Sequence, residues 1–147
     1  MDQQGKIFTL EKKDLKLGYR TSAVKEKGYI VLAAALELRP GNREEIKKLM
    51  EDLKQRRVEK QPLELPSAGS TFKRPEGYFA GKLIMDAGLR GFSIGGAQVS
   101  EKHCGFIVNT GGASASDVLA LIREVQKKVR DKFGVELETE VKFLGEF

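Results

Sequence analysis

Residues 92–109, FSIGGAQVSEKHCGFIVN, contain two short apolar segments separated by a polar turn, and they constrain how the rest of the chain folds. The segments 92–99 and 104–109 have the length and apolar content of strands. Strands that follow one another after so short a turn favour pairing between neighbours. The stretch therefore predicts adjacent antiparallel or mixed strands rather than the separated parallel strands of a doubly wound fold.

Periodic apolar patterns flank these two strands. Ser114 or Ser116 is predicted to cap a long helix that Gly134 ends. A shorter helix is predicted over 79–87, where apolar side chains recur at helical spacing. The stretch 135–143 alternates apolar and polar residues and is predicted to form a last strand. Together these elements predict a small α+β domain of mixed or antiparallel strands with packed helices.

The N-terminal part of the chain has its own pattern. A short strand is predicted over 6–10, and the apolar run within 29–38 predicts a buried strand. Asn42 is predicted to cap a helix that fades near residues 56–57, with Glu45 completing a capping box. The predicted apolar face of this helix comprises Ile46, Leu49, Met50 and Leu53.

The two prolines in residues 61–67, QPLELPS, exclude a regular helix and predict a linker. We therefore expect domains at 1–60 and 61–147. Residues 1–60 carry 15 basic and 10 acidic side chains, whereas residues 61–147 carry 11 of each. A basic half can attract a polyanionic ligand. However, its acids and bases alternate along the predicted helix, which is typical of a solvated face.

The bulk composition limits the class of protein. Apolar residues make up 40% of the 147 residues, and no apolar run approaches the roughly 20 residues of a membrane helix. The N-terminus shows no signal-peptide pattern, so a cytoplasmic location is the default expectation. Cys104 and His103 are the sole cysteine and histidine, which predicts neither a disulfide nor a metal site. No Rossmann or P-loop signature is present.

Three short polar segments are candidates for chemistry: residues 18–20, 68–75 and 138–145. From residue types alone each one is ambiguous. A serine in a proline-bounded loop, such as Ser70, most often bonds local backbone. A glutamate on the polar side of a strand, such as Glu140, is most often solvated.

Taken together, several segments resemble a known family. They are GYRTS at 18–22, AGSTFKRP at 68–75, YFAGKLI at 78–84, GLRGFSIGGAQVS at 88–100, GFIVNTG at 105–111 and EVKFLG at 140–145. In this order they resemble the UDP-N-acetylenolpyruvoylglucosamine reductases, and specifically the C-terminal portion of the shorter, type II branch. The similarity runs over essentially the whole chain. Several motifs in order are far more specific than any one of them.

The resemblance implies a flavin-dependent oxidoreductase of peptidoglycan biosynthesis that uses FAD and NADPH. In the family, NADPH reduces FAD, and the flavin delivers a hydride to the enolpyruvyl group of UDP-N-acetylglucosamine enolpyruvate. Protonation of the neighbouring carbon completes UDP-N-acetylmuramate. The chemistry needs a cation at the substrate carboxylate and a positioned acid, because negative charge develops there.

The resemblance also implies the residues that do this work. Ser70 matches the family's proton donor, Arg20 matches the arginine that stabilises the developing charge, and Glu140 matches the glutamate that assists at the enol stage. An arginine suits this role because its guanidinium can bond both oxygens of a carboxylate. Implied substrate contacts are Tyr19, Lys73 and Arg74. No metal is implied.

The resemblance departs from the family pattern at the N-terminus. Family members carry a flavin-binding domain ahead of the matched motifs, and this chain starts within what resembles the end of that domain. The expected architecture is thus a flavin-domain remnant at 1–60 and a substrate-binding domain at 61–147. One alternative is a non-catalytic UDP-sugar-binding fragment that needs a separate flavin domain. A basic nucleic-acid-binding protein is a third reading, but it lacks the aromatic platforms and signatures of such modules.

Overall fold

The computed structural model describes residues 1–146 and divides into two compact units, Met1–Asn42 and Arg43–Phe147. The predicted boundary between residues 60 and 61 differs from this division, because helix α2, Arg43–Lys60, is grouped with the second unit. No helix within the described part of the chain is both long enough and apolar enough to cross a membrane.

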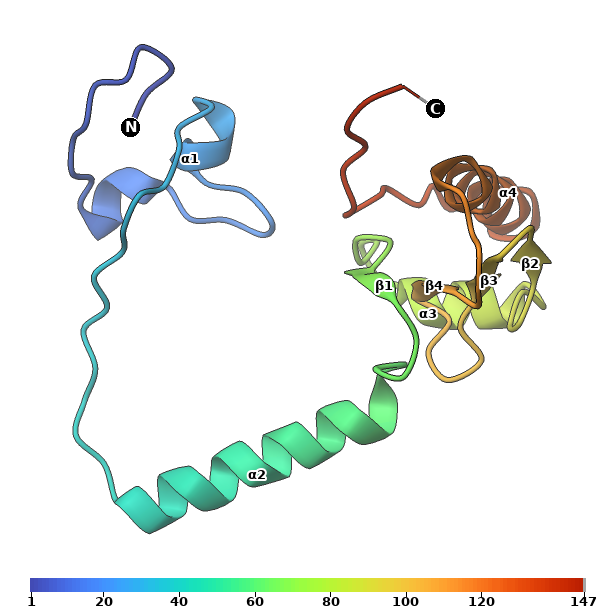
Figure 1. Cartoon of the computed structure of the whole chain (residues 1–147), viewed down its shortest axis with the longest axis horizontal. Coiled ribbons are helices and arrows are strands. Elements are labelled where there is room, and N and C mark those ends of the chain that lie inside the picture. Colours follow the sequence, from blue (N-terminus) through green and yellow to red (C-terminus); the bar gives the residue numbers. More distant parts are fainter. Residues whose placement is uncertain (147) are drawn as a thin grey trace. The chain divides into compact units, whose positions relative to one another are not determined.

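The first unit has little regular structure (Figure 1). Its helices are η1, Lys12–Leu15, and α1, Ala23–Glu26. Met1 and Ile30 are joined by two hydrogen bonds: the terminal ammonium donates to the Ile30 carbonyl at 2.9 Å, and the Ile30 N–H donates back at 2.8 Å. Ala23 is the one buried residue of this unit. A core of its own is therefore nearly absent.

Two strand predictions in this unit are wrong. Residues 6–10 and 29–38 are irregular, and the apolar side chains predicted to be buried are exposed, with Val31 at 63% and Leu36 at 81%. The physical reason is the lack of a neighbour. A strand needs a partner for its backbone groups and a second layer for its apolar side chains. The Tyr29 N–H donates to the Val24 carbonyl and Ile30 is joined to Met1, but these bonds form no strand ladder.

Helix α2 is confirmed, and it continues to Lys60 rather than fading near residues 56–57. Its predicted apolar face is not packed. Ile46, Leu49, Met50 and Leu53 are 48–66% exposed, and the helix has no buried residue. Ion pairs one turn apart support it, such as Arg56 with Asp52 at 2.8 Å.

The second unit contains an antiparallel sheet of order β1-β4-β3-β2 (Figure 1). The strands are β1, Ser67–Ser70; β2, Ser93–Ile94; β3, Ala97–Val99; and β4, Phe106–Asn109. The α+β class is confirmed. The predicted single strand over 92–99 is instead the hairpin of β2 and β3, because Gly95 at φ 54° turns the chain back. Moreover, β1 begins at Ser67, within the predicted linker.

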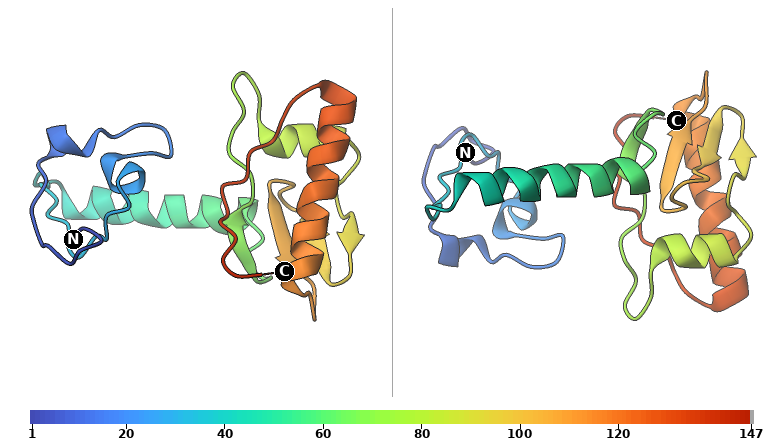
Figure 2. Two further views of the ribbon diagram at one scale, coloured as in Figure 1. Left: turned by 90° about the horizontal axis from the view of Figure 1, so that it is seen from above. Right: turned by 90° about the horizontal axis from the view of Figure 1, so that it is seen from below.

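Two helices pack together beside this sheet (Figure 2). They are α3, Ala80–Asp86, and α4, Ala115–Phe133. Both were predicted to within about two residues, a usual uncertainty at helix ends. The buried core joins both helices to the sheet, and its fully buried side chains include Ile84, Leu89, Val99, Leu121, Ile122, Val125 and Val129.

The last predicted strand, 135–143, forms no ladder. A single bridge links Thr139 to Phe72. The alternation still describes burial in part, since Leu137 is 2% exposed and Val135 and Val141 pack against the core. Phe143 is 43% exposed, contrary to the predicted inward face. The alternating pattern therefore predicted the burial of Val135, Leu137 and Val141, but not that of Phe143. The single bridge at Thr139 is too short to count as a strand.

Ser114, and not Ser116, caps α4. Its side chain accepts from the Asp117 N–H at 3.1 Å, and the Asp117 carboxylate accepts from the Ser114 N–H at 2.9 Å. This capping box lowers the pKa of Asp117, first through the Ser114 N–H.

We expect Ser114→Ala to lower the free energy of unfolding by about 1 kcal/mol. Ser116→Ala should change it little, and urea unfolding followed by circular dichroism measures both. Equal effects would contradict the assignment.

Candidate functional site

Ser70 lies at the end of β1, where its pairing with β4 brings it opposite Phe106. The next residue, Thr71, continues the contact, because its N–H donates to the Gly105 carbonyl at 2.8 Å. Ser70 itself is exposed, while Thr71 is buried at 3%. The exposed Ser70 is thus held in place by the buried Thr71, whose backbone is bonded to Gly105.

The C-terminal segment crosses the same place. The Glu140 N–H donates to the Thr71 carbonyl at 2.8 Å, and the Lys73 N–H donates to the Glu138 carbonyl at 2.8 Å. These two bonds bring Glu140 beside Thr71, the residue that follows Ser70, although 70 positions separate Ser70 from Glu140 in the sequence. Lys73 also forms an ion pair with the Glu138 carboxylate. The structure therefore joins the backbone of residues 71–73, which follow Ser70, to the segment that carries Glu140.

Arg74 is held at the start of the loop that precedes α3. Its Nε donates to the Tyr78 carbonyl at 3.2 Å, and its guanidinium lies 3.9 Å from the centre of the Phe79 ring. Stacking of this kind restricts a guanidinium to one plane. The exposed Arg74 side chain is thereby held in a position where it lines the same pocket as Ser70.

A pocket of about 400 Å³ lies beside Ser70, and we call it the Ser70 pocket. Its lining comprises Ser70, Phe72, Arg74, Phe79, Ala80, Gly81, Lys82, Met85, Arg90, Lys102, His103, Cys104 and Gly105. Four of these residues are cationic and none is acidic. Lys82 pairs with Asp86 at 2.7 Å, and Lys102 pairs with Glu64 at 3.4 Å. Such a lining favours an anionic ligand.

Among the polar lining residues, sequence reasoning identified Ser70 and Arg74 as site residues and missed Lys82, Arg90, Lys102 and His103. Arg90 lies inside the quoted 88–100 motif, but nothing in its spacing distinguishes it from a surface cation. His103 is the sole histidine, and its residue type alone indicates no site. The sheet pairing is what brings the 102–105 loop next to Ser70, and that pairing is not visible in local sequence.

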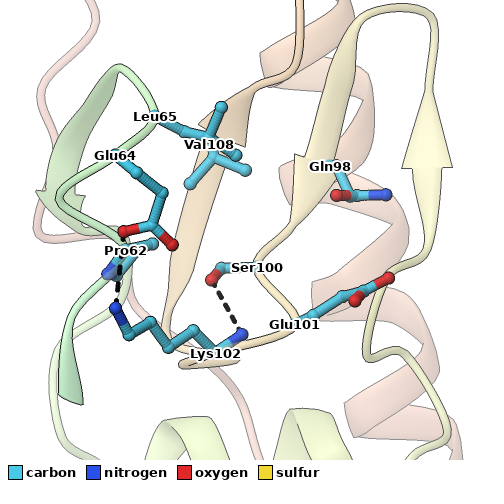
Figure 3. Close-up of a pocket in the computed structure, with 8 residues that line it drawn as sticks. All are labelled: Pro62, Glu64, Leu65, Gln98, Ser100, Glu101, Lys102 and Val108. Carbon is cyan, nitrogen blue, oxygen red and sulfur yellow. Dashed lines mark hydrogen bonds and ion pairs between the residues drawn. The ribbon is translucent and has the colours of Figure 1, made fainter. Parts of the chain in front are cut away.

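A second pocket of about 400 Å³, which we call the Glu64 pocket, lies where the proline-containing loop meets β3 and β4 (Figure 3). Pro62, Glu64, Leu65, Gln98, Ser100, Glu101, Lys102 and Val108 line it. The pKa of Glu64 is lowered, first by its own backbone N–H and further by Lys102. Lys102 lines both pockets. Its backbone N–H donates to the Ser100 hydroxyl at 3.2 Å.

The remaining predicted residues, Tyr19 and Arg20, belong to the first unit. They form the tip of a tight turn closed by Gly18 and Thr21, with the Gly18 N–H donating to the Thr21 carbonyl at 3.0 Å. Arg20 has a left-handed backbone, φ 55°, and its guanidinium lies 5.7 Å from the Tyr19 ring centre. Both side chains are exposed. A left-handed non-glycine residue in such a turn is uncommon and often marks a functional position.

No metal centre is formed by the part of the chain that the structure describes. Within residues 1–146, no three His, Cys, Asp or Glu side chains are grouped so that they could hold an ion.

Comparison with known proteins adds a family to this geometry. A family model described as the C-terminal domain of UDP-N-acetylenolpyruvoylglucosamine reductase matches residues 61–144. Curated proteins named UDP-N-acetylenolpyruvoylglucosamine reductase match nearly the whole chain. The one from Agathobacter rectalis is 65% identical over 97% of this chain and 46% of its own length. The one from Lachnoclostridium phytofermentans is 59% identical over 99% of this chain and 47% of its own length.

A solved structure agrees with these sequence matches. The crystal structure of UDP-N-acetylenolpyruvylglucosamine reductase from Thermus caldophilus superposes with a TM-score of 0.71 at 39% identity. The match covers 87% of this chain and 46% of that chain. The chain therefore spans about half the length of the relatives that it matches.

Proposed function

The chain belongs to the UDP-N-acetylenolpyruvoylglucosamine reductase family, and from this premise we propose that it is the substrate-binding part of a flavin-dependent oxidoreductase of peptidoglycan biosynthesis. The reaction proposed for the complete enzyme is NADPH-dependent reduction of UDP-N-acetylglucosamine enolpyruvate to UDP-N-acetylmuramate. A cytoplasmic location remains part of this proposal, as do the domains 1–60 and 61–147.

One observation carries the proposal: Ser70 lines a cationic pocket, and the carbonyl of the next residue, Thr71, accepts the N–H of Glu140. Reduction of the enolpyruvyl group first pushes negative charge into the substrate carboxylate. One proton must then be delivered to the neighbouring carbon. A hydroxyl at the edge of a pocket can deliver a proton only if neighbouring charges stabilise the alkoxide that it becomes. Lys73 and Arg74 follow Ser70 closely and supply positive charge there.

The other two proposed catalytic residues act on charge and on the enol. Arg20 is proposed to bond the substrate carboxylate and so to stabilise the enolate-like intermediate. Glu140 is proposed to assist when that intermediate is protonated. Tyr19 is proposed as a substrate contact beside Arg20.

The Ser70 pocket is proposed to take the nucleoside diphosphate part of the substrate. Arg74, Arg90 and Lys102 all line it. Phosphate oxygens are strong hydrogen-bond acceptors and carry the charge that such a lining favours. Phe79 lines the pocket and is 60% exposed, which suits a ligand that extends beyond the pocket, as a nucleotide sugar would.

The described residues do not fit FAD by themselves. Both pockets are lined by residues 62–108, and in the first unit the apolar segment 29–38 is exposed rather than folded around a cavity. No reaction step through a flavin is therefore derived from this chain. We propose that FAD binds only when residues 29–38 are covered by a polypeptide equivalent to the part of the A. rectalis relative outside the match, the complementary half. Exposed apolar surface of this extent favours such an interface.

A flavin titration tests this proposal. The purified chain, mixed with FAD and desalted, is expected to retain no visible flavin absorbance. With the complementary half of the A. rectalis relative co-expressed, flavin absorbance and oxidation of NADPH with UDP-N-acetylglucosamine enolpyruvate are expected. A complex that binds FAD but does not oxidise NADPH with this substrate would contradict the proposed reaction.

The alternative is a non-catalytic binding fragment, which the Ser70 pocket also supports. Isothermal titration with UDP distinguishes it. Binding of UDP to the chain without flavin, together with an inactive co-expressed complex, would favour the alternative.

A further inference from the structure

His103 lies in the wall of the Ser70 pocket, and its side chain accepts a hydrogen bond from the backbone. Its Nδ1 accepts the Gly105 N–H at 3.1 Å. A backbone N–H can only donate, so Nδ1 must be unprotonated, and the neutral ring carries its proton on Nε2. An imidazolium would place one N–H against another. The Gly105 peptide therefore selects the neutral Nε2–H tautomer.

The ring is also fixed by its surroundings. It packs edge-on against Phe106, with ring centres 5.0 Å apart. A Cβ added at Gly105 would lie 2.9 Å from His103 Cε1, and one added at Gly81 would lie 3.3 Å from the same atom. The imidazole thus occupies space that two glycines leave open, one on α3 and one before β4. Although His103 is exposed, these contacts limit how far its ring can turn while the bond to Gly105 is kept.

Gly105 connects the His103 ring to the backbone that follows Ser70. The residue is buried, and its carbonyl accepts the Thr71 N–H at 2.8 Å. Thr71 follows Ser70, and the Thr71 carbonyl accepts the Glu140 N–H. A chain of hydrogen bonds therefore runs from the imidazole through the Gly105 and Thr71 peptides to the segment that carries Glu140.

We propose that His103 is a positioning residue, which as the Nε2–H tautomer holds the Gly105 peptide and, through it, the Ser70–Thr71 segment. The effect on catalysis rests on the proposed function, whereas the effect on the backbone does not. Loss of the acceptor removes the partner of the buried Gly105 N–H, and replacing that partner with solvent favours a shift or opening of the segment. A shift of about 1 Å in a reacting group can slow an enzyme by about 10²-fold.

Two variants separate positioning from bulk. His103→Asn places an oxygen close to the position of Nδ1, whereas His103→Leu keeps much of the volume and removes the acceptor. In the isolated chain, His103→Leu is expected to speed amide hydrogen exchange at Gly105 and Thr71 by about 10-fold or more, the factor that a typical lost hydrogen bond corresponds to. His103→Asn should stay within about threefold of wild type on the same scale. The Val99 amide, which donates to Phe92, reports that the core is intact.

A separate measurement addresses the tautomer and the catalysis. Long-range ¹H–¹⁵N spectra of the chain should show the proton on Nε2. In the co-expressed complex, His103→Leu should lower kcat by about 10²-fold with little change in KM, and His103→Asn should recover most of it. A proton on Nδ1, or Gly105 and Thr71 exchange unchanged in His103→Leu, would overturn the proposal. So would a rise in KM alone for both variants, which indicates direct ligand contact. An inactive wild-type complex would refute the proposed function and leave the exchange result to judge His103.

Discussion

Replacing Ser70 with alanine is expected to slow substrate reduction by ~10²–10⁴-fold in the co-expressed complex, because a general acid contributes about that factor. Ser70 is exposed at the end of β1, so the change removes a hydroxyl without opening a cavity in the core. Binding of UDP should be nearly unchanged, since the pocket keeps Arg74, Arg90 and Lys102. The measurement is a single-turnover reaction of pre-reduced flavin with UDP-N-acetylglucosamine enolpyruvate.

Ser67→Ala provides the matched control. Ser67 occupies the other end of β1, is also exposed, and lies opposite Val108 rather than at the Ser70 pocket. It should react at the wild-type rate. An unchanged single-turnover rate in Ser70→Ala would remove the serine from the role of acid. Equal slowing in both variants would indicate disturbed pairing of β1 and β4 instead.

The elements that local sequence predicted best are those whose stability is set locally. The start of α4 follows from a serine three residues before an aspartate, and its end follows from Gly134, which adopts a left-handed backbone at φ 68°. The apolar side chains of this helix then become buried, as their spacing predicts. Strand β4 was likewise predicted because a short, nearly continuous apolar run marks a strand buried on both faces.

Failures of prediction lie where the outcome depends on a partner far along the chain or outside it. Residues 29–38 have the composition of a buried strand, yet composition cannot supply the neighbour that a strand requires. The site shows the same limit. Ser70 and Glu140 were identified by resemblance to a family, whereas their adjacency depends on the two hydrogen bonds that join residues 71–73 to residues 138–140. No local pattern specifies that pairing.

The contrast between the two long helices gives the largest expected effect on stability. Leu121 on α4 is 0% exposed and packs within the core, whereas Leu53 on α2 is 54% exposed. We expect Leu121→Ala to lower the free energy of unfolding by about 2–5 kcal/mol, since it removes buried apolar atoms and leaves a cavity. Leu53→Ala should change it by less than about 0.5 kcal/mol. Urea unfolding of the isolated chain, followed by circular dichroism, measures both.

The same two variants also test whether α2 is exposed to solvent in the complete protein or forms an interface with another polypeptide. If the exposed side chains of α2 become buried by the complementary half, Leu53→Ala should weaken co-purification of the two polypeptides while leaving the isolated chain as stable as before. Such a result would extend the proposed interface from residues 29–38 to α2. If Leu53→Ala instead destabilises the isolated chain by several kcal/mol, then Leu53 is already packed within this chain and is not available to an interface. Strong destabilisation by Leu121→Ala is expected in either case, because its packing lies entirely within the second unit.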